Sequence, residues 1–255
     1  GEIYGAVKRL SPWEIWGNRA KIKTIMVSPE TVIISVGGSM IVPDGIDTQF
    51  LTTLREHLTK ETEQGSRFVL ISGGGKTSRR YAEALKAVRN DISNDDLDWL
   101  GIHATRLNGH LLRAVFFDVA DPVMYTNPET VPSRPEFPIT IAAGFRPGAS
   151  TDYVAVSIAK HIGATRMVNL SNIDYAYTAD PRIDPTATPI EKIDWPAFRK
   201  LIPDAWDPGL SSPFDPVAAK EAQSIGLEVA IIHGKQSTEL KKYLAGDDFK
   251  GTRIM

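Results

Sequence analysis

The sequence predicts an α/β fold, a three-layer sandwich in which helices cover both faces of a mostly parallel, open sheet. Short apolar and β-branched runs alternate along the chain with longer segments of helical spacing. Several of these runs are continuously apolar and are closed by glycines, as is typical of buried parallel strands. In such folds, ligands bind at the carboxyl ends of the strands.

The first two strands are expected at residues 31–36 and 67–72, since both runs are apolar and end in glycines. Between them, residues 46–60 have helical spacing. The apolar face of this helix comprises Ile46, Phe50, Leu54 and Leu58. Two further helices should follow the second strand, one through residues 81–88 and one over 95–117. The stripe expected on the longer helix is Leu97, Leu100, Ala104, Leu107 and Leu111.

The same alternation continues to the end of the chain. We expect strands at 138–142, 166–170 and 227–232, and helices at 151–162, 215–225 and 237–244. Asp215 should be the N-cap of its helix, with Pro216 at the first helical position. The Pro-rich stretches 181–189 and 203–213 are expected to be surface loops.

Residues 1–25 differ from the rest, being basic overall and carrying Trp13 and Trp16. They precede Met26, which could be a native start. We therefore expect an extension over 1–25 that need not be native, and one domain over 26–255. The alternative is an extra helix that packs on this domain or on a neighbouring subunit.

Composition limits the partners and the chemistry. The formal net charge of −2 argues against nucleic acid as the main partner, because neutralising phosphates needs a basic surface. The chain has no cysteine, which excludes disulfides and thiolate metal sites, and no histidine pair has zinc-ligand spacing. No apolar run approaches the ~20 residues that span a bilayer. We expect a cytoplasmic protein without a membrane partner.

Three glycine-bearing loops follow predicted strands. They are Gly37-Gly38-Ser39, Gly73-Gly74-Gly75-Lys76 and residues 144–152. Glycine lets backbone N–H groups approach an anion closely, and a following helix adds its N-terminal dipole. One such loop is as often only a turn, but three on one sheet edge could surround a chain of phosphates.

Two familiar phosphate motifs do not fit these loops. Gly75-Lys76-Thr77 resembles the end of a P-loop, but the first glycine of that motif would fall at Leu70, inside a strand. In a dinucleotide-binding motif that starts at Gly73, the third glycine position is Ser78. We reject both motifs.

Charged residues beside the loops have two interpretations each. Arg79, Arg80 and Arg146 could bind phosphate or be solvated surface charges. Asp152 opens a helix, where it could complement the dipole or could hold Mg²⁺ or orient a cation. The segment 171–181 suits a nucleoside pocket but could equally be an ordered loop.

Taken in order, these segments resemble the amino acid kinase superfamily, and within it the archaeal type of uridylate kinase. The resemblance runs from about Thr31 to Ile254. The strings that carry it are ISVGGSMIVP, SGGGKTSRRYAEA, LDWLGIHATRLNGHLL, RPGASTDYVA, IDYAYTADPR, FDPVAAKEA and GTRI.

The resemblance implies direct in-line transfer of the terminal phosphoryl group of ATP to UMP, giving ADP and UDP. It implies that Asp152, Gly37 and Gly38 are catalytic. The residues it assigns to ATP are Gly37, Gly38, Ser39, Gly75, Arg79, Ser171, Tyr177 and Asp180. Those it assigns to UMP are Gly74, Asp98 (at the ribose), Phe145, Arg146, Pro147, Gly148, Ala149, Ser150 and Thr151.

The resemblance also implies Mg²⁺ bound through the phosphates and Asp152, with no other side chain assigned to the metal. The expected partners are small-molecule nucleotides and copies of the same chain, in a hexamer built from dimers. The long helix over 95–117 could supply a subunit face.

Three positions depart from the family pattern. Bacterial relatives carry a lysine in the first strand, where this chain has Ser35 and Val36. Tyr175 replaces a glycine, and Ala143 stands where a Gly-Gly pair is usual. Two alternatives therefore stay open. One is a kinase of the same superfamily with a carboxylate, carbamate or isoprenoid phosphate acceptor. The other is a nucleotide- or oxyanion-binding storage or regulatory protein without turnover.

Overall fold

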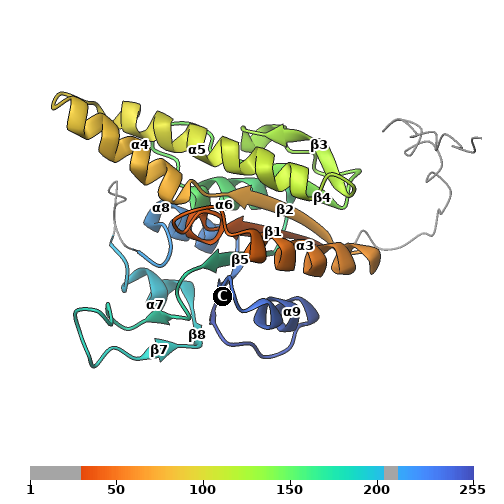
Figure 1. Ribbon diagram of the computed structural model, residues 1–255. Helices are drawn as coiled ribbons and strands as arrows, with labels where there is room; N and C mark the ends of the chain where they lie inside the picture. The colour runs from red at the N-terminus through yellow and green to blue at the C-terminus, as the bar shows by residue number, and fades with distance from the viewer. Residues whose placement is uncertain (1–29, 204–211) are drawn as a thin grey trace, which may run out of the picture.

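The computed structural model describes residues 30–203 and 212–255 (Figure 1). The extension expected over 1–25, with Trp13, Trp16 and the following Met26, lies outside the described residues. Most of the loop expected over 203–213 lies outside them as well.

An eight-stranded sheet runs through the molecule in the order β3-β4-β2-β1-β5-β9-β10-β8. Its strands are β1 Thr31–Val36, β2 Arg67–Ser72, β3 Ala120–Tyr125, β4 Ile139–Ala142, β5 Arg166–Ser171, β8 Lys192–Ile193, β9 Glu228–His233 and β10 Thr252–Ile254. The six strands from β3 to β9 are parallel. Only β10 and β8, which pair with each other in parallel, run against them. The predicted fold class is confirmed.

Helices cover both faces of this sheet (Figure 1). The helices are α2 Gly38–Ile41, α3 Thr48–Glu63, α4 Gly75–Val88, α5 Asn94–Val115, α6 Thr151–Ile162, α7 Trp195–Arg199, α8 Pro216–Ser224, α9 Ser237–Ala245 and the 3₁₀ turn η1 Pro128–Thr130. Side chains of α2, α3, α5 and α9 join one core cluster, and those of α6, α7 and α8 join the other. Ile33 and Ile34 of β1 enter opposite clusters, because successive strand residues point to opposite faces.

Capping chemistry sets the start of α3 later than the apolar spacing predicts. The Asp47 carboxylate accepts a hydrogen bond from the Phe50 amide at 2.9 Å, so Asp47 is the N-cap. Ile46 therefore precedes the helix and is 56% exposed, and its expected place on the buried face is wrong.

The buried face of α5 also differs from the predicted stripe. Leu107 is 64% exposed, whereas Thr105 and Asn108 are buried with Ile102 and Leu112. Apolar spacing in the sequence does not indicate this face, because two of its buried residues are polar.

Several short elements were not predicted. β3 includes Asp121 and Pro122 and lies at a sheet edge, where proline is tolerated. β8, β10 and α7 are two to five residues long, too short for a periodic signal. A separate two-stranded sheet pairs β6 Ala176–Tyr177 with β7 Pro189–Ile190. None of the helices in the described ranges has the length and apolar character that crossing a membrane requires.

Candidate active site

The three glycine loops meet at one edge of the sheet. They follow β1, β2 and β4, and the order β4-β2-β1-β5 makes these strands neighbours. Since the strands are parallel, their carboxyl ends lie together, with the end of β5 beside that of β1. The sequence predicted this shared edge.

The first two loops are in direct backbone contact. A Cβ added to Gly38 would lie 2.0 Å from the Gly75 nitrogen, and one added to Gly75 would lie 2.2 Å from the Gly38 carbonyl oxygen. Gly75 also has a φ of +63°, a conformation that favours glycine. Close packing of two loops therefore requires these glycines, whether or not a phosphate binds there.

The amides of the first loop are not all free. The Gly37 N–H donates to the Leu170 carbonyl at 2.9 Å, which continues the β1–β5 pairing. Gly37 therefore cannot offer its N–H to a phosphate, contrary to the sequence-based expectation. Gly38 and Ser39 lie in the first turn of α2, where helix amides lack intrahelical acceptors. Within the described ranges neither amide has a protein acceptor.

Helix α5 holds the loop after β4 in place. The Gly144 N–H donates to Thr105 Oγ1 at 2.8 Å. Arg106 donates from Nε to the Gly144 carbonyl at 3.2 Å and from Nη2 to the Phe145 carbonyl at 3.1 Å. One end of the predicted acceptor loop is thus fixed by a guanidinium that the sequence analysis did not single out.

The middle of this loop is held by Asp98, two turns earlier on α5. Asp98 Oδ2 accepts a hydrogen bond from the Gly148 N–H at 2.8 Å. The residue expected at the UMP ribose therefore lies directly against the predicted acceptor loop. Farther along α5, Asn108 Nδ2 donates to the Gly73 carbonyl at 2.8 Å and to that of Gly74 at 3.2 Å. One helix organises two of the three loops.

Asp152 points into the sheet edge. Ser150, not Asp152, caps α6, since Ser150 Oγ accepts the Tyr153 N–H at 3.1 Å. The Asp152 carboxylate accepts hydrogen bonds from Ser35 Oγ at 3.2 Å and Asn169 Nδ2 at 3.3 Å. It also accepts the Asp215 N–H at 3.3 Å. Asp152 therefore joins the carboxyl ends of β1 and β5 to the start of α8.

The electrostatics of this carboxylate are unusual. Burial, and to a smaller extent the negative charge of Asp215, raise the pKa of Asp152 to about 7. The hydrogen bonds from the Asp215 N–H and the Ser35 hydroxyl oppose this shift. Within the described residues no lysine or arginine forms an ion pair with it. Of the two functional interpretations offered by the sequence, Mg²⁺ or a neighbouring lysine or arginine, the described residues supply no such lysine or arginine within ion-pair distance.

A magnesium ion would have few protein ligands at this edge. In residues 30–203 and 212–255 no group of three or more His, Cys, Asp or Glu side chains could hold a metal. Asp152 and Asp215 present two carboxylates, and Asp215 Oδ1 already accepts the Ala218 N–H at 2.7 Å as the predicted N-cap. In proteins Mg²⁺ is usually bound through one or two carboxylates together with substrate phosphates.

The arginines near the loops divide into two groups. Arg80 pairs with Asp44 at 2.8 Å on the exposed surface, as the surface-charge interpretation predicts. Arg79 and Arg146 are exposed, and Arg146 Cζ lies 5.2 Å from the centroid of the Phe145 ring. Arg79 and Arg146 remain candidates for phosphate contacts.

Beyond β5 lies the segment expected to bind ATP. Ser171 accepts the Gly234 N–H at 2.8 Å, and the rings of Tyr175 and Tyr177 meet edge-on at 6.4 Å. Tyr175 is thus half-buried against Tyr177, not a freely exposed replacement of a glycine. Asp180 is bound by Arg182 at 2.7 Å, and this hydrogen bonding lowers the pKa of Asp180 to about 2.

Two polar residues from the end of the chain reach the same segment. Lys250 Nζ lies 3.0 Å from Asp174 Oδ2, and Gln236 Nε2 donates to Asp174 Oδ1 at 2.8 Å. Neither residue belongs to a local motif, so the sequence alone does not indicate its place at this segment.

The fold and this edge define an α/β protein with glycine loops at the carboxyl ends of adjacent parallel strands. The sequence profile described as the amino acid kinase family matches residues 30–233. The chain belongs to the amino acid kinase family.

Curated relatives cover most of the chain. A uridylate kinase of Methanocorpusculum labreanum is 33% identical over 227 residues, 88% of this chain and 94% of that protein. A uridylate kinase of Pyrococcus abyssi is 32% identical over 88% of this chain and 98% of its own length.

Solved structures share the fold at lower identity. The uridylate kinase of Archaeoglobus fulgidus matches with a TM-score of 0.73 and 22% identity, over 89% of this chain and 100% of that one. The aspartate kinase of Synechocystis matches with a TM-score of 0.67 and 15% identity, over 88% of this chain and 39% of that chain. The same fold therefore occurs in kinases named for different acceptors.

Proposed function

We propose that this chain is a nucleoside monophosphate kinase that transfers the terminal phosphoryl group of ATP to UMP, giving ADP and UDP. One observation carries the proposal. Three glycine loops lie at neighbouring strand ends with Asp152 beside them, in a chain 33% identical to a uridylate kinase over 88% of its length. An edge of this kind offers backbone donors and helix N-termini to phosphate chains from two substrates.

In this proposal the amides of Gly38 and Ser39 bind the donor phosphates. The loop from Phe145 to Thr151, held by Asp98 and Arg106, binds the acceptor. Catalysis then consists of positioning and charge neutralisation, and no protein nucleophile is required. Arg79 and Arg146 supply positive charge, and Asp152 orients the groups at the point of transfer. Mg²⁺, bound mainly to the phosphates, would neutralise charge on the transferring group.

A coupled assay of ADP release with ATP, Mg²⁺ and each nucleoside monophosphate tests the proposal. We expect UMP to be preferred over CMP, AMP and GMP, because polar groups left unpaired by the wrong base penalise it. Equal rates with all four would refute UMP as the specific acceptor, but they would still support nucleoside monophosphate kinase activity. Activity with a carboxylate, carbamate or isoprenoid phosphate alone would assign another acceptor. ATP binding without ADP release in any mixture would favour the storage or regulatory alternative.

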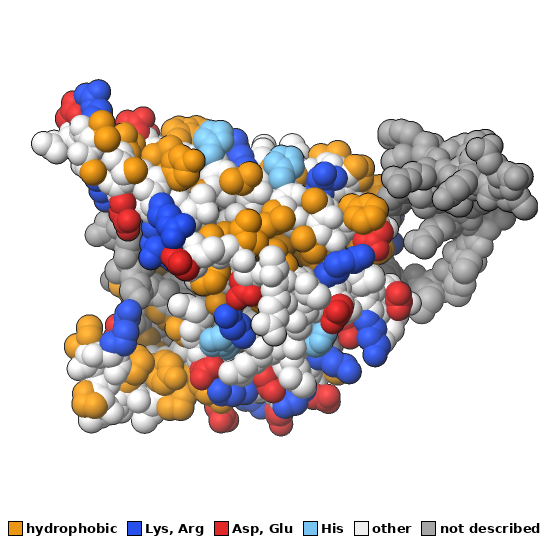
Figure 2. Space-filling view, in the orientation of Figure 1, with side chains coloured by type: hydrophobic (Ala, Val, Ile, Leu, Met, Phe, Trp, Pro, Cys, Tyr) orange, Lys and Arg blue, Asp and Glu red, His pale blue; other side chains and the backbone are white. Residues whose placement is uncertain are grey.

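We further propose that the chain is a cytoplasmic homo-oligomer, a hexamer built from dimers. The support is an exposed apolar surface on α4 and α5, where Figure 2 shows hydrophobic side chains grouped. Tyr81, Val88 and Leu107 are 61%, 81% and 64% exposed there. Large exposed apolar patches are typical of interaction sites. Light scattering at micromolar concentration should give a multiple of the chain mass, and a strictly monomeric mass would refute the assembly.

A further inference from the structure

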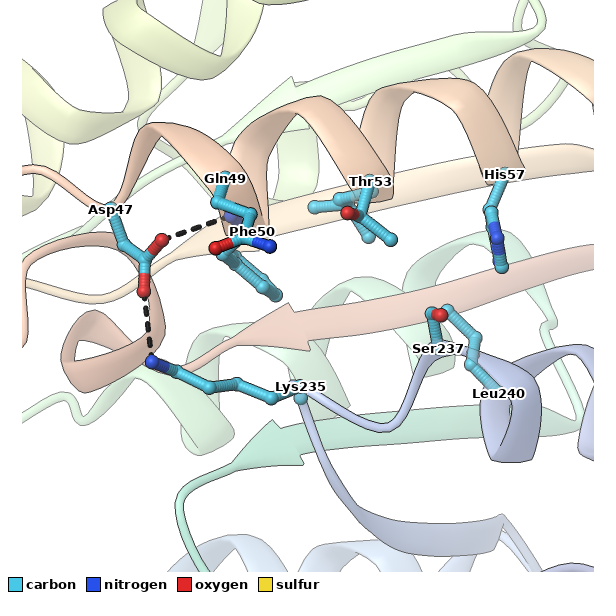
Figure 3. Close-up of a pocket in the computed structure, with 10 residues that line it drawn as sticks. Asp47, Gln49, Phe50, Thr53, His57, Lys235, Ser237 and Leu240 are labelled. Atoms are coloured by element: carbon cyan, nitrogen blue, oxygen red, sulfur yellow. Dashed lines mark hydrogen bonds and ion pairs between the residues drawn. The ribbon is translucent and has the colours of Figure 1, made fainter.

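A cavity of about 160 Å³ lies between α3 and α9 (Figure 3). The residues that line it are Asp47, Gln49, Phe50, Thr53, Leu54, His57, Gly234, Lys235, Ser237 and Leu240. None of the residues assigned to ATP or UMP is among them. The cavity is therefore a feature that the proposed reaction leaves unexplained.

Four polar side chains of this lining have no partner among the described residues. Gln49, Thr53 and His57 come from α3, and Ser237 from the first turn of α9. In Figure 3 His57 points from α3 toward Ser237 and Leu240 of α9. Within the part of the chain that the structure describes, none of the four side chains makes a hydrogen bond. An amide, an imidazole and two hydroxyls can each donate and accept hydrogen bonds, so together they can match the edge of a heterocyclic base.

The rest of the inner lining is apolar. Phe50, Leu54 and Leu240 are 6%, 4% and 3% exposed and belong to the core. A few polar groups over an apolar surface are typical of small-molecule sites, and aromatic ligands favour such surfaces.

The groove continues outward and becomes positively charged. A second cavity of about 340 Å³ shares His57, Ser237 and Leu240 with the first. It adds Lys60 and Lys241, and neither ammonium group has an ion pair within the described residues. Among the described residues that line this cavity, Glu61 alone carries a carboxylate, so the outer groove has a net positive charge. Two ammonium groups that line one cavity without an ion pair in the described part of the chain suit a phosphate chain.

We propose that the groove between α3 and α9 is a second nucleotide site, separate from the donor and acceptor sites. The base occupies the inner cavity over Phe50 and Leu54, with its edge toward Gln49, Thr53, His57 and Ser237. The phosphates extend outward to Lys60 and Lys241.

The inner end of the groove adjoins the first glycine loop. Lys235 Nζ pairs with Asp47 Oδ2 at 3.0 Å, linking the start of α9 to the N-cap of α3. The preceding Gly234 packs on α2, since a Cβ there would lie 2.5 Å from Met40 Sδ. The same short helix carries Gly38 and Ser39. A nucleotide in the groove therefore borders the element proposed to bind the donor phosphates, and its occupancy should change the affinity for ATP.

Equilibrium dialysis with radiolabelled ATP, GTP, CTP and UTP tests the site without any turnover, so its result is separate from that of the kinase assay. At saturation the wild-type chain should bind one nucleotide more than its active site holds. His57→Leu and the double variant Lys60→Gln/Lys241→Gln should weaken this extra binding roughly tenfold or more, since each removes hydrogen-bonding or charged contacts. Nucleotide binding at the active site should be unchanged in these variants.

Matched controls are His103→Leu on α5 and Lys86→Gln on α4, both exposed and far along the sequence from the groove. They should bind as the wild type does, and thermal unfolding should show that all variants are folded. A single nucleotide per chain with every triphosphate would overturn the proposal. So would extra binding that the groove variants leave unchanged, or that inorganic triphosphate matches in affinity, since no base would then be recognised.

Discussion

Asp152 is a half-buried residue whose carboxylate accepts hydrogen bonds from a hydroxyl, a side-chain amide and a backbone N–H. These donors come from Ser35, Asn169 and Asp215, and they orient the carboxylate without neutralising it. A carboxylate in this position should repel phosphates unless a cation accompanies it. We therefore infer that its charge is useful only when a substrate-bound cation is present.

Replacing Asp152 with asparagine should separate catalysis from folding. Asn keeps the shape and can still accept the Asp215 N–H, so the variant should fold, with an unfolding temperature at neutral pH no lower than that of the wild type. The lost helix-dipole contribution is about 1 kcal/mol or less. The kcat should fall by roughly a hundredfold or more, the scale seen when one electrostatic contact to the transition state is removed. Steady-state kinetics and thermal unfolding of the two proteins measure both effects. A kcat within a few-fold of wild type, with a sharply lower unfolding temperature, would make Asp152 structural.

Arg106 illustrates a residue that acts through another segment. Its guanidinium donates hydrogen bonds to the carbonyls of Gly144 and Phe145. The guanidinium carbon also lies 5.9 Å from the centroid of the Trp99 ring. Together with Asp98, which accepts the Gly148 N–H, it fixes the start and the middle of the proposed acceptor loop.

We predict that Arg106→Met raises the KM for UMP roughly tenfold or more while the KM for ATP changes little. Hydrogen bonds to a charged group contribute about 1.5–3 kcal/mol, and losing them lets the acceptor loop move. Arg113→Met, about two turns farther along α5, is the control and should resemble the wild type. Equal rises in both KM values would contradict a role specific to the acceptor loop.

At the scale of elements, the contact between the loops after β1 and β2 fixes the sheet edge. The Gly73 N–H donates to the Val36 carbonyl at 2.9 Å, and Lys76 N–H to the Val42 carbonyl at 2.9 Å. The first bond joins the loop after β2 to the end of β1, and the second ties the start of α4 to the C-cap of α2. In this packing no space remains for a side chain at Gly38.

Gly38→Ala should therefore destabilise the protein. Its Cβ would meet backbone atoms of Gly75 at 2.0 and 2.6 Å, and backbone cannot rotate away as a flexible side chain can. We expect a loss of about 1–3 kcal/mol or more in the free energy of unfolding, measured by urea denaturation. Gly45→Ala in the same connection is the control, because nothing lies within 4 Å of its added Cβ. Equal stabilities of the two variants would show that the loops separate easily.

For the whole molecule, Asp152 gives stability a defined pH dependence. Its pKa is about 7 in the folded state and near 3.8 when unfolded, so between these values the folded protein binds more protons. The free energy of unfolding therefore loses this contribution as pH rises from about 4 through 7.

Asp152→Asn should remove this component. Relative to the wild type, the variant should gain stability between pH 5 and pH 8, since the buried charge no longer forms. Urea denaturation of both proteins at several pH values gives the difference, in which other titrating groups largely cancel. A difference that is constant with pH would contradict the raised pKa.

Most of the architecture could be predicted because it depends on local patterns. β1 and β2 have the predicted bounds, and α6 begins and ends as expected, with Gly163 ending it at a φ of +73°. Apolar runs, glycine positions and helix caps are properties of neighbouring residues, so the sequence contains them directly.

The sequence by itself determined the alternation of strands and helices, the three glycine loops and the family resemblance. Only the tertiary structure decided which groups meet. It placed the Gly37 N–H on the β5 carbonyl and Arg106 on the acceptor loop, and among the described residues it gave Asp152 the partners Ser35, Asn169 and Asp215 and no lysine or arginine. The tertiary structure also decided that α3 and α9 enclose a cavity. These facts join residues tens to hundreds of positions apart, and their geometry depends on strand order and helix packing, which no local pattern encodes.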